Sequence, residues 1–232
     1  MMYNKSIKNS SSTRLFMKKK SFEFKKIAYT SVATLAVLGF IYPALEPVLV
    51  QAVTDTVQVS LTVDAGITIT SPIDVTMAPN LGVVANSSIG SSVWNVKTND
   101  PDGYTLGVLA ATTPALQQSG IDTFADYTEA TPGTPDVWSV NASSKEFGYS
   151  AFGADVSTAT WGTSASCGVA GVPAGAQKYD GFTASNSIVA TKNATTTTSG
   201  VDTTVCYAAA QNGIYASSGV YVANITATAT VQ

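Results

Sequence analysis

The sequence predicts an all-β protein, an antiparallel β-sandwich of about eight to ten strands that follows an N-terminal signal helix. Two observations predict this fold. After residue 52, short runs that alternate apolar and polar side chains recur between clusters of Gly, Pro, Asn and Asp. The same region contains no long amphipathic helical pattern. A closed β-barrel is the alternative arrangement of such strands.

The first 52 residues have the features of an export signal. Eight of the twelve basic residues precede Ile27–Leu45, a run without charge. A basic region before an apolar run is the form of a secretory signal peptide, and Val50–Ala52 offers a cleavage site. We therefore expect residues 1–52 to be removed and residues 53–232 to form a single domain, secreted or at the cell surface. The alternative is an uncleaved signal anchor that holds the protein in the membrane.

The charged residues after residue 52 exclude several classes of function. Four Lys stand against thirteen acidic residues there, without any Arg, so nucleic acid is a poor partner. The chain has no His, which removes Ser-His-Asp and Cys-His arrangements and nearly every zinc site. Asp100–Gly103 resembles part of a calcium loop, but a tight turn accounts for all of its residues. We expect no catalytic residue, no metal and no cofactor.

Strand candidates begin soon after the expected cleavage site. Val57–Val63 alternates four apolar with three polar residues, which predicts a half-buried first strand. Gly66 and Pro72 bracket a second candidate at Ile67–Thr70, and Ile73–Met77 is a third.

The stretch Ser91–Leu106 predicts a hairpin with an aromatic core face. Two short β runs flank Asn99–Gly103, a segment in which Asn, Asp, Pro and Gly all favour a turn. Each run directs two residues to one face, and together they form the predicted core of the hairpin: Trp94, Val96, Tyr104 and Leu106.

The remainder of the chain contains a long irregular segment and three further strand candidates. Pro and Gly interrupt Thr113–Pro135, which predicts a long loop. Ser187–Thr191 and Thr203–Ala209 are short candidates, whereas Tyr221–Val231 alternates over its whole length. We expect this last strand to lie in the centre of a sheet or to pair with the first strand.

The two cysteines, Cys167 and Cys206, lie in the part of the chain that is expected to be exported. An even pair outside the cytosol most simply forms a disulfide. Closing a loop of about 40 residues would stabilise the fold by roughly 3.5–4 kcal/mol. The alternative, a reactive or metal-binding pair, is less favoured because no other soft ligand accompanies it.

Three aromatic residues outside the predicted strands are candidates for stacking on sugars: Trp161, Tyr127 and Tyr179. Asp126 and Glu129 are paired carboxylates of the kind that glycosidases use. Because they lie in the irregular segment, a solvated acidic loop is the better interpretation.

Several of these features together resemble a group of surface proteins. They are the leader, the Val57–Val63 strand, Trp94-Asn95-Val96 with Asn99, Gly103–Leu106, and the closing strand rich in Thr and Ala. The chain resembles uncharacterised secreted envelope proteins of Gram-positive-like and candidate-phylum bacteria, and more distantly the WxL-domain surface proteins. The latter resemblance implies non-covalent attachment to the cell wall, although Val96 stands where that motif has Leu.

These observations predict a non-enzymatic cell-surface protein with a structural or adhesive role. Val57–Val63 and Tyr221–Val231 could pair between copies by strand addition, which would make the protein a homo-oligomer. The alternative is a carbohydrate- or cell-wall-binding module that holds a surface glycan with its loop aromatics. A glycosidase with an acid pair is a third hypothesis.

Overall fold

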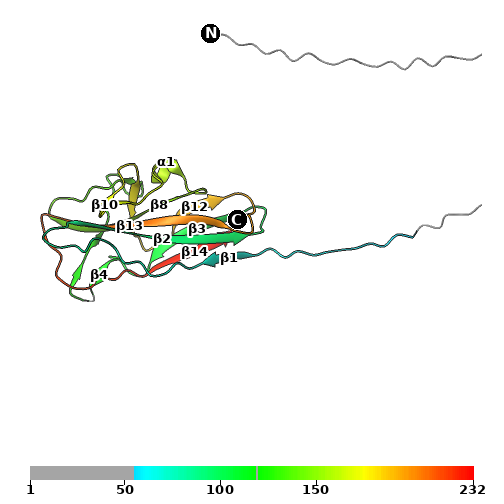
Figure 1. Ribbon diagram of the computed structural model, residues 1–232, viewed down its shortest axis with the longest axis horizontal. Helices are drawn as coiled ribbons and strands as arrows, with labels where there is room; N and C mark the ends of the chain where they lie inside the picture. The colour runs from blue at the N-terminus through cyan, green and yellow to red at the C-terminus, as the bar shows by residue number, and fades with distance from the viewer. Residues whose placement is uncertain (1–54, 119) are drawn as a thin grey trace, which may run out of the picture. The chain divides into compact units, whose positions relative to one another are not determined.

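Strands make up nearly all of the regular structure (Figure 1). The computed structural model describes residues 55–118 and 120–232. The predicted signal peptide at residues 1–52, and the signal anchor that is its alternative, lie outside these residues. Leu61–Gln232 form one compact unit. Its helix α1 (Thr158–Trp161) has four residues, and within the described part of the chain no helix has the length and hydropathy to cross a membrane.

The larger of the two main sheets has seven strands and is built around β13 (Val201–Asn212). This strand pairs antiparallel with β2 (Ser87–Thr98) on one side and with β8 (Ser144–Gly153) on the other. β1 (Ile67–Thr70) lies beside β2 and forms one edge of the sheet. Beyond β8 the sheet continues through three short strands: β11 (Lys178–Gly181), β7 (Asp136–Val137) and β6 (Ala125–Asp126), which runs parallel to β8.

The smaller main sheet has three antiparallel strands. β3 (Tyr104–Ala110) lies in its centre, between β12 (Ser187–Lys192) and β14 (Ile225–Val231). Two further ladders have strands of two residues each, and they pair β4 (Gln117–Gln118) with β5 (Asp122–Thr123) and β9 (Gly168–Val169) with β10 (Val172–Pro173).

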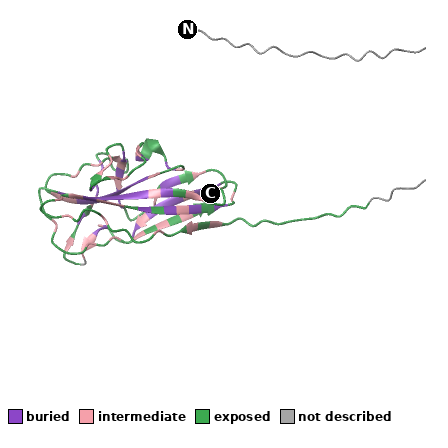
Figure 2. Cartoon of the chain, in the orientation of Figure 1, coloured by how far each residue is buried: buried purple, intermediate pink, exposed green. Residues whose placement is uncertain are grey.

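Both main sheets contribute to one hydrophobic core. Figure 2 shows the buried residues concentrated along the long strands. The core includes side chains from β2, β3, β8, β12 and β13: Trp94, Val96, Tyr104, Leu106, Val108, Phe147, Tyr149, Val189 and Val205. The predicted all-β fold with antiparallel sheets is therefore confirmed. Among the described residues neither main sheet closes on itself, so the closed barrel is not the architecture.

The predicted hairpin at Ser91–Leu106 does not form, although its four core residues are all buried. β2 and β3 belong to different sheets, and the turn between them carries the chain from one sheet to the other. The prediction was wrong because alternation fixes which face of a strand is buried but does not fix which strand pairs with it. The turn needs glycine at its end, since Gly103 has φ +87° and a Cβ there would collide with the carbonyl of Lys192.

The predicted first strand at Val57–Val63 is also absent. The structure assigns no strand to residues 55–66, and the first strand is β1 at Ile67–Thr70, as predicted for that segment. Ile73–Met77 forms no strand either, and the chain next touches β2 through a bridge between Ala78 and Ile89. Alternation shows that a segment could pair as a strand, but it does not show which edge the segment can reach. The nearest edge, that of β2, is occupied by β1.

The strands predicted in the C-terminal half agree better with the structure than those predicted before residue 80. Ser187–Thr191 falls within β12 and Thr203–Ala209 within β13, so both are confirmed. The last strand begins later than predicted, at Ile225, and keeps its alternation. It pairs with β3 alone and lies at an edge, so the expected central position or pairing with the first strand was wrong.

Candidate functional site

The predicted disulfide is confirmed. Cys167 and Cys206 are bonded, with their Cα atoms 5.3 Å apart. Cys206 is fully buried in the middle of β13, and Cys167 directly precedes β9. The bond therefore fixes an irregular segment, 39 residues away in sequence, to the central strand of the larger sheet.

The three aromatic candidates for sugar stacking are buried, which corrects the prediction. Trp161 is 3% exposed, Tyr127 4% and Tyr179 0%. Tyr127 stacks on Trp138 with ring centroids 4.6 Å apart, and Trp138 also meets the edge of Tyr179. The hydroxyl of Tyr179 donates to the carbonyl of Cys167 at 3.2 Å. Tyr127 and Tyr179 pack with Trp138 beside the disulfide, and Tyr179 does so from β11. Trp161 ends α1 and packs into the main core.

The prediction that Glu129 lies in a solvated loop was wrong, because its side chain is buried. It is 9% exposed and accepts a hydrogen bond of 2.6 Å from the backbone N–H of Gly181. Its carboxylate also lies beside that of Asp180 on β11, whereas Asp126 accepts from the N–H of Ala115 at 2.9 Å. The structure thus places Glu129 beside Asp180. Asp180 lies 51 positions later, so no local sequence pattern could identify it as the partner.

Burial, followed by the hydrogen bond and charge of Glu129, raises the pKa of Asp180 to about 7. Burial alone would raise the pKa of Glu129 as well, but hydrogen bonds from Asp180 and Gly181 outweigh it and lower that pKa. The two carboxyl groups therefore share one proton near neutral pH.

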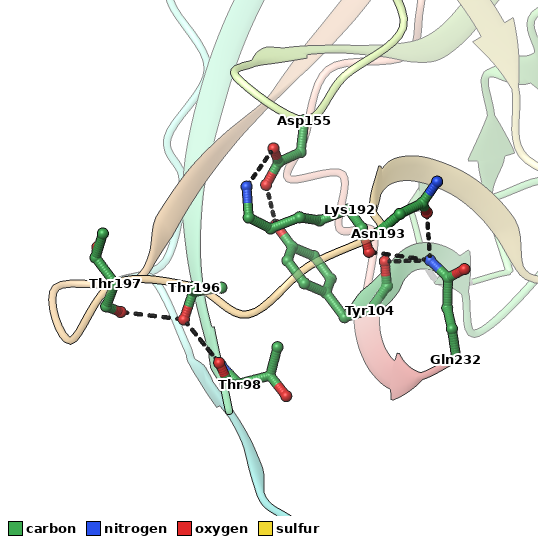
Figure 3. Close-up of polar contacts among 8 residues, drawn as sticks. All are labelled: Thr98, Tyr104, Asp155, Lys192, Asn193, Thr196, Thr197 and Gln232. Atoms are coloured by element: carbon green, nitrogen blue, oxygen red, sulfur yellow. Dashed lines mark hydrogen bonds and ion pairs between the residues drawn. The ribbon is translucent and has the colours of Figure 1, made fainter. Parts of the chain in front are cut away.

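A polar cluster joins four segments at one end of the small sheet (Figure 3). Asp155 accepts from the Lys192 ammonium at 3.1 Å and from the Tyr104 hydroxyl at 3.0 Å. Burial and then the bond to Asp155 raise the pKa of Tyr104. The side-chain amide of Gln232 donates to the carbonyl groups of Tyr104 and Lys192 at 2.9 and 3.1 Å. These bonds hold the ends of β3, β12 and β14 together, which is a structural role.

Two open hollows lie on the surface of the unit. One has a volume of about 520 Å³ and is lined by Pro72–Thr76 and by Gly90–Val93 of β2. The other has a volume of about 600 Å³ and lies beside the polar cluster, between Ala154–Ser157 and Ile188–Ala194. Neither hollow is lined by Glu129 or Asp180, so the acid pair does not face these spaces.

The most unusual surface feature is apolar. The alternating side chains at residues 57 to 63 are between 72 and 89% exposed: Val57, Val59, Leu61 and Val63. β14 has the complementary property, since it pairs with β3 on one side and, in the described residues, with no strand on its other side. An apolar segment with a strand pattern and a strand with an unpaired edge are the two components that strand addition needs.

Comparison with protein-family models, with curated proteins and with solved structures finds no match to this chain. The resemblance to envelope proteins and WxL domains therefore stays a prediction from the sequence.

Proposed function

We propose that this protein is a non-enzymatic structural component of the cell surface whose copies join by strand addition. In this proposal the two main sheets face each other as a sandwich around the shared core, and residues 57–63 of one copy pair with a sheet of the next. The observation that carries the proposal is the exposure of four alternating apolar side chains in a segment that forms no strand within its own chain.

Burying the four exposed apolar side chains of residues 57–63 would stabilise the pairing of this segment with another copy. Burying one Val or Leu side chain contributes about 1.5–3 kcal/mol, so the four together contribute roughly 6–12 kcal/mol. Ordering seven residues costs about 1–2 kcal/mol each, which is of similar size. The backbone hydrogen bonds of the added strand then decide the balance. We therefore expect assembly to be reversible and to increase with protein concentration, as it would on a crowded cell surface.

Export to the cell surface is supported by two features. Residues 1–52 have the composition of a secretory leader. The Cys167–Cys206 disulfide is of the kind that persists outside the reducing cytosol. The alternative function, glycan binding, was predicted from Trp161, Tyr127 and Tyr179, and all three side chains are buried.

The test places the same charge on the apolar face of the segment in one variant and on its polar face in the other. Leu61→Asp places a charge in the apolar row, and Ser60→Asp places the same charge on the polar side. We expect the exported protein and S60D to form large species at high concentration by light scattering and electron microscopy, and L61D to stay monomeric. A wild-type protein that remains monomeric at high concentration, or an L61D variant that assembles like S60D, would disprove the proposal.

A further inference from the structure

We infer that the edge that receives residues 57–63 is the unpaired edge of β14 in a neighbouring copy. This inference rests on the proposed function and names the partner surface within it. Three features of the described residues point to β14: the protection of the other edges, the match in length and pattern, and the half-buried apolar side chains beside it.

The other edges of the two main sheets carry features that discourage pairing. β1 has four residues and is soon followed by Pro72, and β7 has only two residues. β12 contains a register shift between Ile188 and Ala190 and ends at Lys192. Short strands, prolines, bulges and lysines are the usual protections of a sheet edge. β14 has none of them, since Ile225–Val231 pairs with β3 in an unbroken register and contains neither charge nor proline.

The donor and the acceptor match residue for residue. Val57–Val63 and Ile225–Val231 each have seven residues, with apolar side chains at the first, third, fifth and seventh positions. The intervening positions are small or polar, and those of β14 are exposed: Thr226, Thr228 and Thr230. Paired in register, the two strands direct both apolar rows to the same face and both polar rows to the other. The match holds for either direction of the added strand, because both patterns are symmetric about their centres.

The surface beside β14 is incompletely covered within one copy. Ile225, Ala227 and Ala229 pack against the core but are only half-buried. β1 lies next to β14 in the fold, and its Ile67 and Ile69 are half-buried against the same core (Figure 1). The Val and Leu side chains of an added strand would cover this apolar surface.

The hollow beside β2 is a poorer acceptor. Five residues separate Asn95, which pairs with β1, from Ile89, which bridges to Ala78. Seven residues of an added strand do not fit between these two pairings. Residues Pro72–Thr76 also already line the hollow.

Cysteine cross-linking at the strand centres tests the inference without disturbing either apolar row. Ser60 and Thr228 are the central residues of the two patterns, so they face each other in both strand directions. Opposite residues in paired strands are close enough for a disulfide. We would mix S60C with T228C under mild oxidation and run non-reducing gels. Each variant oxidised alone provides a control for chance collisions, and S60C mixed with Thr68→Cys probes the exposed face of β1.

We expect a cross-linked dimer from S60C with T228C, little from S60C with T68C, and loss of the dimer when L61D is added to the S60C chain. An assembled protein without the first cross-link, or with a stronger one through T68C, would overturn the inference and leave the proposed function in place. A protein that never assembles would overturn both.

Discussion

Opening the disulfide should destabilise the fold by several kcal/mol. The bond closes a loop with a sequence separation of 39 residues. On the chain-entropy model, closure of such a loop stabilises the native state by about 4 kcal/mol. Domains of this size are stable by only about 5–15 kcal/mol, so we expect Cys167→Ala to lower the free energy of unfolding by a large fraction. The assay is urea unfolding of the exported protein, followed by tryptophan fluorescence.

A second variant separates the cross-link from the packing of sulfur in the core. C167A leaves the thiol of Cys206 in its fully buried place on β13, whereas C167A/C206A removes that sulfur as well. If the covalent loop is what stabilises the fold, both variants lose about the same free energy. The slope of the unfolding free energy against urea should also rise, because an open chain exposes more surface. A loss below about 1 kcal/mol in C167A would refute the loop-closure reasoning.

Two further predictions concern the acid pair and the turn before β3. Because the pKa of Asp180 is raised to about 7 in the folded protein, its contribution to stability is present at low pH and is lost as the pH rises through about 7. Asp180→Asn should flatten the decline in unfolding free energy between about pH 4 and pH 7, and an equal decline in both proteins would refute the assignment. Gly103→Ala should destabilise more than Gly133→Ala, since both residues have positive φ but only a Cβ at 103 meets the backbone of Lys192. Equal losses in the two variants by thermal unfolding would show that the close approach has no energetic effect.

The sequence correctly predicted the burial of alternating side chains and the disulfide. The alternation in β2 and β3 correctly buried Trp94, Val96, Tyr104 and Leu106, because side chains two positions apart share a face. The even number of cysteines and their location after the expected leader were enough to predict their bond. Both inferences use properties of the chain that do not depend on the arrangement of the strands.

Strand partners and loop packing could not be predicted in this way. β2 pairs with β13, a strand more than a hundred residues later, rather than with β3 across a short turn. Tyr127 is buried in a segment between short strands, and Tyr179 is buried in β11, a strand of four residues that is too short to show a clear alternation. The pairing of Glu129 with Asp180 depends on the same long-range arrangement.

Hydrogen exchange of the backbone amides at residues 57–63 tests strand addition most directly. The exported protein would be compared at low concentration and in assemblies, with the amides of β13 as an internal reference for slow exchange. We predict fast exchange at residues 57–63 in the dilute protein and strong protection in assemblies, since an added strand bonds its amides to a neighbour. Assemblies in which these amides exchange as fast as in the dilute protein would contradict the account.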